Sequence, residues 1–273
     1  MHGPTIHSNI AIRISDVAYA YSPTAPEPTL QGVSLDSTEG EFLCLLGPSG
    51  CGKTTVLRLI AGFDVPSAGE IWVNGNAVHG PDVDRGVVFQ GDDSLFNWLT
   101  AADNVAFGAK MRGMSRAERT EIAERFLALV GLEGHGHKFP SELSGGMRQR
   151  IQIARVLAND PQILLMDEPF GALDAQTRAE LQDELVRIWE ATKKTVVFIT
   201  HDIGEALLLS NRIGIMRRGP RANVREIIEV DLPRPRSRSS VRFGELYEFI
   251  NNIIIEEVKL SRLESRSTNG VGK

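Results

Sequence analysis

The amino-acid sequence predicts an α/β fold with a mostly parallel sheet. Two observations lead to this prediction: short apolar runs alternate with helical stretches along the chain, and a glycine-rich loop joins one such run to a helix. Helices that connect parallel strands cover both faces of a sheet, so the strands read as continuous apolar runs. The length of 273 residues fits one large domain, with or without a smaller subdomain.

The predicted elements of the first ninety residues are mostly strands. Residues Ile10–Val17 alternate between apolar and polar side chains, as a half-buried strand does. Three prolines then indicate a loop over Ser22–Pro28. The apolar run Phe42–Leu46 ends at the glycine-rich loop, and a helix is expected from Thr54 to Ala61. Two further strands are expected at Gly69–Val73 and Gly86–Phe89.

A long helical block, Leu95–Leu157, opens the second part of the chain. Within it, Ser115 and Glu118 have the spacing of a capping box. The helix that follows is expected to bury one apolar face, made by Ile122, Phe126, Leu129 and Val130. A strand, a helix and a strand come next, at Ile163–Met166, Gln176–Ala191 and Thr195–Thr200. The helical block is therefore expected to form a subdomain inserted between strands.

The composition changes after Asn211, where nine arginines as far as Arg242 face only three acidic residues. Two interpretations of this segment stay open: a solvated basic face and tail, or a segment close to an anionic membrane surface. A short helix is expected to follow, with periodic apolar positions at Phe243, Leu246, Tyr247, Ile250 and Ile254.

Composition also narrows the class of protein. Hydrophobic residues make up 42% and charged residues 24% of the chain, which argues against wholesale disorder. The formal net charge of −5 argues against a nucleic-acid binder. Because no apolar run reaches the length of a membrane span and no signal segment begins the chain, we expect the protein to stay where it is made. Its two cysteines, Cys44 and Cys51, favour a reducing cytosol over a disulfide framework.

The glycine-rich loop fits the phosphate-binding pattern G-x-x-x-x-G-K-[ST], with the residues Gly47, Pro48, Ser49, Gly50, Cys51, Gly52, Lys53 and Thr54. It follows a predicted strand and opens a helix, which is the context that the pattern requires. The backbone N–H groups of such a loop converge on phosphate oxygens, and the helix N-terminus adds positive potential. Lys53 is expected to reach the β- and γ-phosphates, and Thr54 to offer its hydroxyl to Mg²⁺.

Two adjacent carboxylates, Asp167 and Glu168, follow the apolar run Ile163–Met166. In open α/β sheets, ligands bind where the strands end. We therefore expect Asp167 to hold Mg²⁺, directly or through water, and Glu168 to polarise an attacking water.

A third pattern consists of Leu143, Ser144, Gly145, Gly146 and Met147, directly before a predicted helix. Its exposed N–H groups could bind a second anion, although an ordinary serine N-cap has the same sequence. One chain with two phosphate-binding helix ends favours a dimer that holds nucleotide between its subunits.

Together these motifs resemble the ATPase subunit of an ATP-binding-cassette (ABC) transporter over residues 10–236. The resemblance implies a RecA-like P-loop NTPase core with an antiparallel β subdomain. It also implies an inserted α-helical subdomain, residues 91–157, that carries the signature 143–147. Residues 237–273 are then a C-terminal tail with a short helix.

The resemblance assigns roles to further residues. Gln90 is similar to the family's glutamine that contacts Mg²⁺ and the attacking water, and His201 to its switch histidine at the γ-phosphate. Asp174, which ends the run 171–174, matches the loop that bridges two subunits. Tyr21 stands where the family places an aromatic ring on adenine, with Tyr19 as a rival. The resemblance implies two ATP molecules, each held by 47–55 of one chain, including Thr55, and by 144–146 of the other.

The segment 95–100 lies where this family's ATPase subunits meet a membrane permease. Its side chains Phe96, Trp98 and Leu99 suit an interface, with burial inside the helical subdomain as the alternative. The segment resembles that of importers for nitrate, taurine and alkanesulfonates.

The resemblance implies a peripheral ATPase on the cytoplasmic face of the membrane. Its expected ligands are ATP and Mg²⁺. Its expected partners are a second copy or a similar ATPase subunit, two permease chains and, indirectly, a solute-binding protein outside the membrane, with no nucleic acid. A soluble ABC ATPase without a membrane partner, and a transporter subunit for an unrelated substrate, stay open as alternatives.

Overall fold

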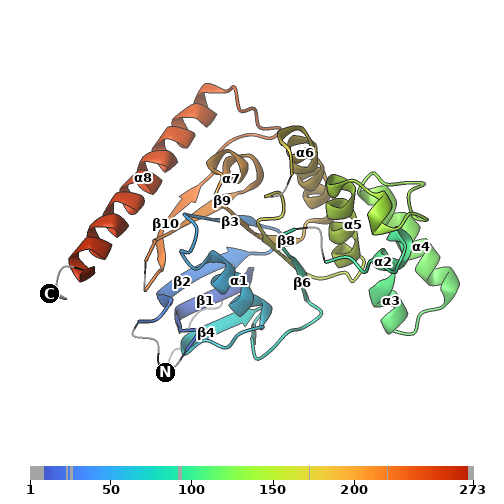
Figure 1. Cartoon of the computed structure of the whole chain (residues 1–273), viewed down its shortest axis with the longest axis horizontal. Helices are drawn as coiled ribbons and strands as arrows, with labels where there is room; N and C mark the ends of the chain where they lie inside the picture. Colours follow the sequence, from blue (N-terminus) through green and yellow to red (C-terminus); the bar gives the residue numbers. More distant parts are fainter. Residues whose placement is uncertain are drawn as a thin grey trace. The chain divides into compact units, whose positions relative to one another are not determined.

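The computed structural model describes residues 9–22, 24, 27–91, 94–171, 173–219 and 221–269, with side chains as far as 259. The chain divides into two compact units (Figure 1). The first unit comprises Met1–Pro81 and Thr195–Lys273, and the second comprises Asp82–Lys194.

The first unit contains an antiparallel sheet with the strand order β2-β1-β4-β5. Its strands are β1 (Ile10–Tyr19), β2 (Leu30–Thr38), β4 (Ala68–Val73) and β5 (Asn76–Ala77). Ile12 and Ile14 of β1 lie opposite Val73 and Ile71 of β4, and all four side chains are buried. The expected antiparallel subdomain is therefore present, although the sequence prediction ended β1 early and missed β2.

The first unit also holds four strands in the order β10-β9-β3-β8. They are β3 (Phe42–Leu46), β8 (Thr195–Thr200), β9 (Arg212–Met216) and β10 (Val224–Glu229). Strand β3 is parallel to β8 and β9, and β10 is antiparallel to β9. Every residue of β3 and β8 is buried, as expected of parallel strands covered on both faces. Two helices follow these strands along the chain, α1 (Lys53–Ala61) and α7 (Ile203–Leu209).

The second unit contains the parallel pair β6 (Arg85–Val88) and β7 (Ile163–Asp167). Its helices are α2 (Ala101–Val105), α3 (Phe107–Met111), α4 (Arg116–Leu129), the 3-10 turn η1 (Pro140–Glu142), α5 (Gly145–Leu157) and α6 (Ala175–Thr192). This compact unit spans more of the sequence than the predicted insertion at 91–157, because it also includes the two strands and α6.

Helix α4 confirms the capping box and corrects the buried face. Ser115 Oγ accepts from the Glu118 N–H, and the Glu118 carboxylate accepts from the Ser115 N–H. The helix buries Ala123 and Leu127. The predicted Ile122, Phe126 and Leu129 are only half-buried, and Val130, just past the helix end, is buried as predicted. The face prediction was wrong because the small Ala123 was overlooked beside larger apolar neighbours.

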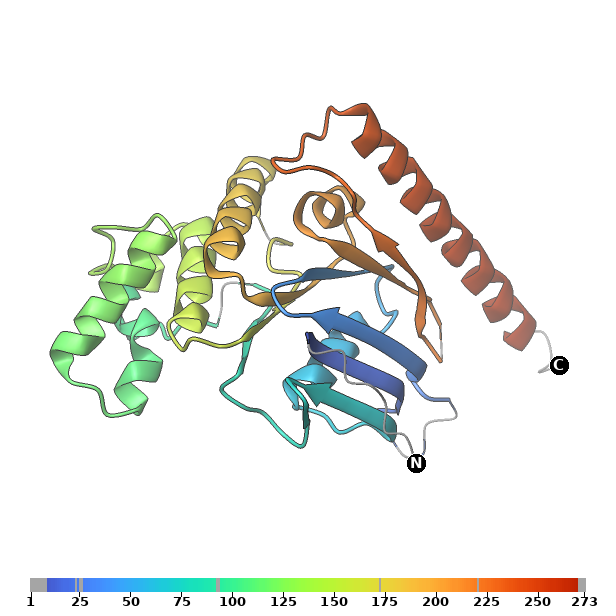
Figure 2. The same ribbon diagram turned by 180° about the vertical axis from the view of Figure 1, so that it is seen from behind.

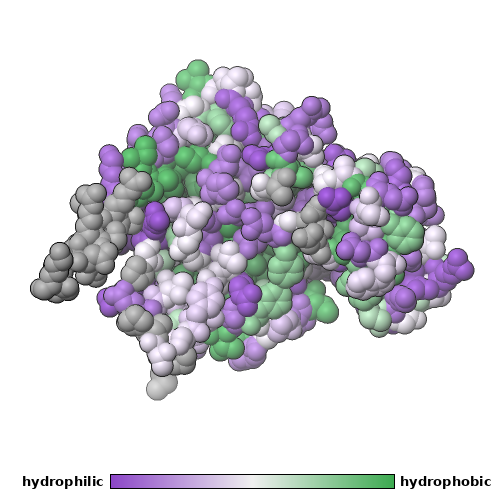
Figure 3. Space-filling model, in the orientation of Figure 1, coloured by the Kyte–Doolittle hydropathy of each residue, from purple (hydrophilic) through white to green (hydrophobic). Residues whose placement is uncertain are grey.

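The C-terminal helix α8 is much longer than predicted and runs from Val241 to Asn269. Figures 1 and 2 both show it alongside β10 of the first unit. Phe243, Ile250 and Ile253 are buried, and Figure 3 shows apolar residues gathered between α8 and β10. The guanidinium of Arg225 in β10 donates to two consecutive carboxylates of α8, Glu256 at 2.7 Å and Glu257 at 2.8 Å.

Several of the nine arginines after Asn211 are held by the fold. Arg234 and Arg236 donate to backbone carbonyls around the C-terminal end of α7, those of Leu207, Leu208, Leu209 and Ser210. These carbonyls lack partners within their own helix. Burial, with a smaller contribution from neighbouring Arg234, lowers the pKa of Arg236 to about 10. The two arginines are therefore neither a solvated face nor a membrane-binding patch.

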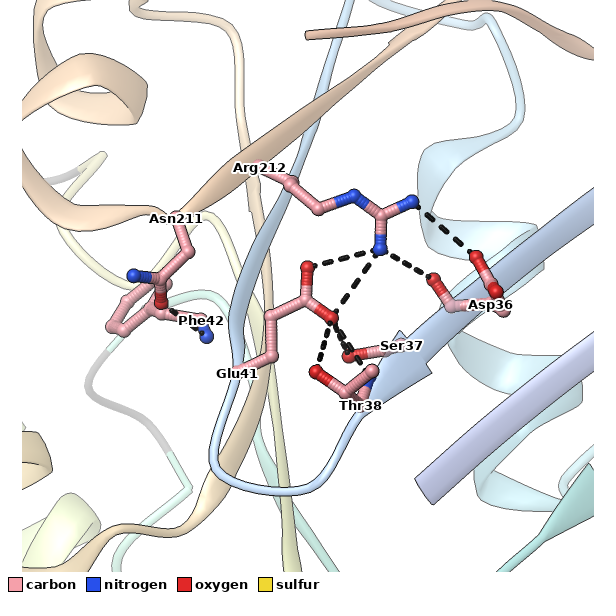
Figure 4. A network of polar contacts seen from close by, with 7 residues as sticks. All are labelled: Asp36, Ser37, Thr38, Glu41, Phe42, Asn211 and Arg212. Atoms are coloured by element: carbon pink, nitrogen blue, oxygen red, sulfur yellow. Dashed lines mark hydrogen bonds and ion pairs between the residues drawn. The ribbon is translucent and has the colours of Figure 1, made fainter. Parts of the chain in front are cut away.

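A buried carboxylate ties the end of β2 to the start of β9 (Figure 4). Glu41 is 7% exposed and accepts hydrogen bonds from Ser37 Oγ at 3.0 Å and from the Thr38 N–H at 2.7 Å. The guanidinium of Arg212 lies 3.1 Å from Glu41 Oε1 and 3.3 Å from Asp36 Oδ1. The charge of Glu41 is thus paired and hydrogen-bonded, which is the condition for burying it. This network joins the antiparallel sheet to β9, which lies beside β3, the strand that leads into the phosphate-binding loop.

Candidate functional site

The glycine-rich loop 47–54 joins the buried strand β3 to helix α1, as predicted. Gly50 and Gly52 have φ values of 79° and 87°, in the left-handed region that favours glycine. A Cβ atom at Gly52 would lie 2.5 Å from Leu30 Cδ2, whereas one at Gly50 would meet nothing within 4 Å. The loop therefore needs glycine at 52 both for its conformation and for space.

Lys53, the first residue of α1, is 5% exposed. Its ammonium donates to the carbonyl of Gly47 at 2.8 Å and to that of Pro48 at 3.2 Å. This places a positive charge within the loop, at a helix N-terminus that itself attracts anions. Thr54 is exposed, in the first turn of the helix. Burial raises the pKa of the Cys51 thiol, so this side chain acts as a small neutral group in the loop.

His201 leaves the parallel strands beside the loop. Strands β3 and β8 are in register with Leu46 opposite Thr200, so the next residues, Gly47 and His201, come out of the sheet side by side. His201 is exposed. The first unit thus brings together the predicted phosphate loop and the predicted switch histidine.

The two candidate tyrosines differ in exposure. Tyr21 is 63% exposed, and its hydroxyl lies 2.8 Å from Thr55 Oγ1 in α1. Tyr19 is 9% exposed and packs against Tyr21, with ring centroids 5.1 Å apart and planes at 85°. Only Tyr21 of this pair has a ring surface open to a ligand, so the geometry favours it over Tyr19 for the predicted adenine contact.

In the second unit, the register of β6 and β7 brings Gln90 close to the two carboxylates. Val88 lies opposite Met166 in this parallel pair. Gln90 and Glu168 each follow two residues later, with Asp167 at the end of β7. All three predicted residues therefore lie at the carboxyl end of one strand pair.

Glu168 has a φ of 43°, an uncommon conformation for a non-glycine residue. Such strain occurs often at functional sites, where the surrounding structure maintains it. A Cβ atom on Gly171 would lie 3.5 Å from the Glu168 carbonyl and 3.6 Å from Gln90 Nε2. Gln90, Glu168 and the turn after it are therefore close neighbours.

Ser144 and Asp174 both cap helices of the second unit. Ser144 Oγ accepts from the Met147 N–H at 3.3 Å, and Gly145 opens α5. A Cβ atom on Gly146 would lie 2.5 Å from Thr177 Cγ2, so α5 and α6 pack closely there. Asp174 accepts from the N–H groups of Gln176 and Thr177 and from the Thr177 hydroxyl, and these hydrogen bonds lower its pKa. Ala172, within the predicted loop 171–174, lies outside the described residues.

Comparison with known proteins identifies the family. A sequence model described as ABC transporter matches residues 30–171, just over half of the chain. The chain is 52% identical over 229 residues to an uncharacterized ABC transporter ATP-binding protein of Methanocaldococcus jannaschii. The aligned region covers 84% of this chain and 85% of that protein. The chain belongs to the ABC transporter family, as an ATP-binding subunit. It is also 46% identical over 222 residues to the nitrate import ATP-binding protein NrtD of Synechococcus elongatus, covering 81% of each.

Two further comparisons concern this ABC ATPase. It is 42% identical over 270 residues to the bicarbonate transport ATP-binding protein CmpC of a Synechocystis strain, covering 97% of this chain and 40% of that longer protein. A dimeric structure of a bacterial ABC transporter cassette superimposes with a TM-score of 0.70 at 34% identity, covering 81% of this chain and all of the other. The predicted fold class and the ATPase activity are confirmed by this family membership.

Each unit offers an oxygen side chain of the kind that Mg²⁺ prefers alongside substrate phosphates. These are the exposed Thr54 hydroxyl in the first unit and the Asp167 carboxylate in the second. Within the described ranges, no group of three or more His, Cys, Asp or Glu side chains could hold a metal ion by itself. None of the described helices has the length and apolar character of a membrane span.

The segment 94–100 of the ABC ATPase is held by Asn104, which the sequence analysis missed. The buried side chain of Asn104 accepts from the Phe96 N–H at 2.9 Å and donates to the carbonyls of Phe96, Leu99 and Thr100. With its backbone fixed in this way, the loop leaves Trp98 73% exposed. The interface interpretation is thus favoured for Trp98 over burial in the helical subdomain, whereas Phe96 and Leu99 are half-buried.

A groove of about 570 Å³ lies beside this segment. Its lining includes the apolar side chains Phe89, Phe96, Phe107 and Met111, together with Arg85, Arg112 and Arg155. Arg155 of α5 donates to the Ser94 carbonyl at 2.8 Å and lies 5.3 Å from the centre of the Phe96 ring. Arg155 was also missed, because it lies 61 residues from Ser94 and no local pattern marks the pair.

Proposed function

We propose that this ABC ATPase drives the uptake of a small anion, with nitrate and bicarbonate as the first candidates and taurine and alkanesulfonates in the same class. The observation that carries the proposal is similarity to importer subunits of that class. The chain is 46% identical to a nitrate import protein and 42% identical to a bicarbonate transport protein, over 81% and 97% of its length. It is also 47% identical to the nitrate transport protein NasD of Klebsiella oxytoca over 249 residues.

The proposed catalytic unit is a dimer of cassettes, which the dimeric structure of a related cassette supports. Residues 47–55 of one chain and 144–146 of the other then hold each ATP. Thr54, Gln90 and Asp167 provide ligands for Mg²⁺, which when bound offsets phosphate charge. Glu168 accepts a proton from the attacking water, and His201 together with Lys53 stabilises the charge on the transferred phosphoryl group.

We place the permease contact at the groove beside Trp98. An exposed tryptophan next to an aromatic groove has the composition of a protein interface core. The ATPase then lies peripherally on the cytoplasmic face of the membrane, and two permease chains connect it to a solute-binding protein on the other side. Closing and reopening of the ATPase dimer would be transmitted through this groove.

Uptake in cells tests the proposed substrate class. Labelled nitrate, bicarbonate, taurine and an alkanesulfonate are supplied to cells with and without the gene. We expect uptake of one of them to be lost without the gene and restored by the wild type but not by Lys53→Ala, which lacks the loop ammonium. Unchanged uptake of all four compounds would overturn the substrate proposal.

Trp98→Ala tests the permease contact separately. Truncation of a central interface tryptophan typically costs about 2 kcal/mol or more, which is a factor of about thirty in affinity, so we expect uptake to fall by about thirtyfold. ATP hydrolysis by the purified chain should be unchanged, because Trp98 is exposed and outside the nucleotide site. Trp72→Ala is the matched control, since Trp72 is an exposed tryptophan of the antiparallel sheet. Equal uptake by both variants would contradict the docking site.

A further inference from the structure

Tyr21 is joined to α1, the helix that follows the phosphate loop, by a hydrogen bond. Its hydroxyl and that of Thr55 are 2.8 Å apart, and either could be the donor. Thr55 is buried in the first turn of α1, directly after Thr54. Tyr21 is 63% exposed, so its side chain is held mainly by this hydroxyl contact and by the ring of Tyr19.

A second set of contacts supports Tyr21 from the same helix. The rings of Tyr19 and Tyr21 pack in a T-shaped arrangement. Burial and the nearby charge of Asp64, to which Tyr19 is hydrogen-bonded, raise the pKa of Tyr19. Asp64 in turn accepts from Arg58, at 2.6 Å and 3.3 Å. Arg58 lies three residues after Thr55 in α1, so the two residues share one face of the helix.

The direction of the Tyr21–Thr55 hydrogen bond depends on what Thr55 binds. A threonine hydroxyl has one proton and two lone pairs, and phosphate oxygens at neutral pH act as acceptors. When Thr55 donates its proton to a phosphate, it can only accept from Tyr21. The phenol must then be the donor, and the bond that could run either way in the free chain has a single direction in the complex.

We propose that Tyr21 is a positioning residue for the nucleotide phosphates, acting through Thr55. By donating to Thr55 Oγ1, Tyr21 orients the Thr55 proton toward a phosphate oxygen, independently of any stacking of its ring on a base. The inference rests on the proposed binding of nucleotide by residues 47–55. It does not depend on which solute is transported. A negative result in the uptake experiment would therefore leave this inference standing, and a negative result in the binding experiment would leave the substrate proposal standing.

Removing one oxygen atom tests this role. Tyr21→Phe keeps the ring and loses the hydroxyl. We expect the affinities for ATP and for inorganic tripolyphosphate, each with Mg²⁺, to fall by the same factor, about three- to tenfold, the effect of one neutral hydrogen bond. Calorimetric titration of the purified full-length chain measures both. Tyr247→Phe is the matched control, because it removes the same atom from an exposed tyrosine of α8, which is not part of these contacts, and should leave both affinities within about twofold.

A thermodynamic cycle with Thr55 separates this role from a general structural effect. In a Thr55→Val background Tyr21→Phe should have no further effect, whereas in Thr55→Ser, which keeps a hydroxyl, the full loss should return. A loss seen for ATP but not for tripolyphosphate would overturn the proposal, because Tyr21 would then act through the base. An unchanged affinity for both ligands, or an undiminished loss in the Thr55→Val background, would overturn it as well.

Discussion

Glu168→Gln is expected to slow ATP hydrolysis by about 10²–10⁴-fold, the usual contribution of a general base, with little change in ATP affinity. Glutamine has the shape of glutamate but cannot accept the proton of the attacking water. The backbone places this side chain at the end of β7 next to Gln90, in a strained conformation that the surrounding turn maintains. The rate of phosphate release at saturating ATP and an ATP titration measure the two effects.

Glu190→Gln is the matched control for this prediction, because Glu190 is an exposed glutamate in α6 of the same unit. We expect its hydrolysis rate to stay within about twofold of wild type. Near-wild-type hydrolysis by Glu168→Gln would remove Glu168 from the proposed role. A parallel loss of ATP binding would point to a structural effect instead.

Gly52→Ala is expected to lower the free energy of unfolding by roughly 2–5 kcal/mol, the sum of backbone strain and overpacking. The φ of 87° disfavours any residue with a Cβ atom, and that atom would lie 2.5 Å from Leu30 Cδ2. Leu30 is fully buried, so it has little room to move away. Urea unfolding of the purified variant measures the change.

Gly50→Ala separates the two parts of this effect. Gly50 has a similar φ of 79°, but a Cβ atom there meets nothing within 4 Å. Gly50→Ala should therefore lower the free energy of unfolding only through the strain of the left-handed conformation, by about 1–2 kcal/mol. Equal losses in the two variants would show that contact with Leu30 contributes nothing, and the requirement for glycine at 52 would be conformational alone.

The features that could be predicted from the sequence are those that depend on residues close together in the chain. The phosphate loop was predictable because its glycines, lysine and threonine stand in consecutive positions between a strand and a helix. Strands β3, β7 and β8 were predictable because parallel strands buried on both faces require unbroken apolar runs. The capping box of α4 needs only two side chains three residues apart.

Other features depend on contacts between distant segments. Strands β9 and β10 were hidden by the arginine-rich composition, and α8 is tied to β10 by hydrogen bonds from Arg225 to two carboxylates some thirty residues later. The Tyr21 hydroxyl meets Thr55 across 34 residues, and Arg155 meets Ser94 across 61. The amino-acid order specifies the phosphate loop, the carboxylates after β7 and the helix start at Ser144, because short-range patterns encode them. The folded chain leaves Tyr21 exposed and Tyr19 buried, exposes Trp98 and uses half-buried arginines as structural ties, because these outcomes depend on which distant surfaces are packed together and thereby removed from water.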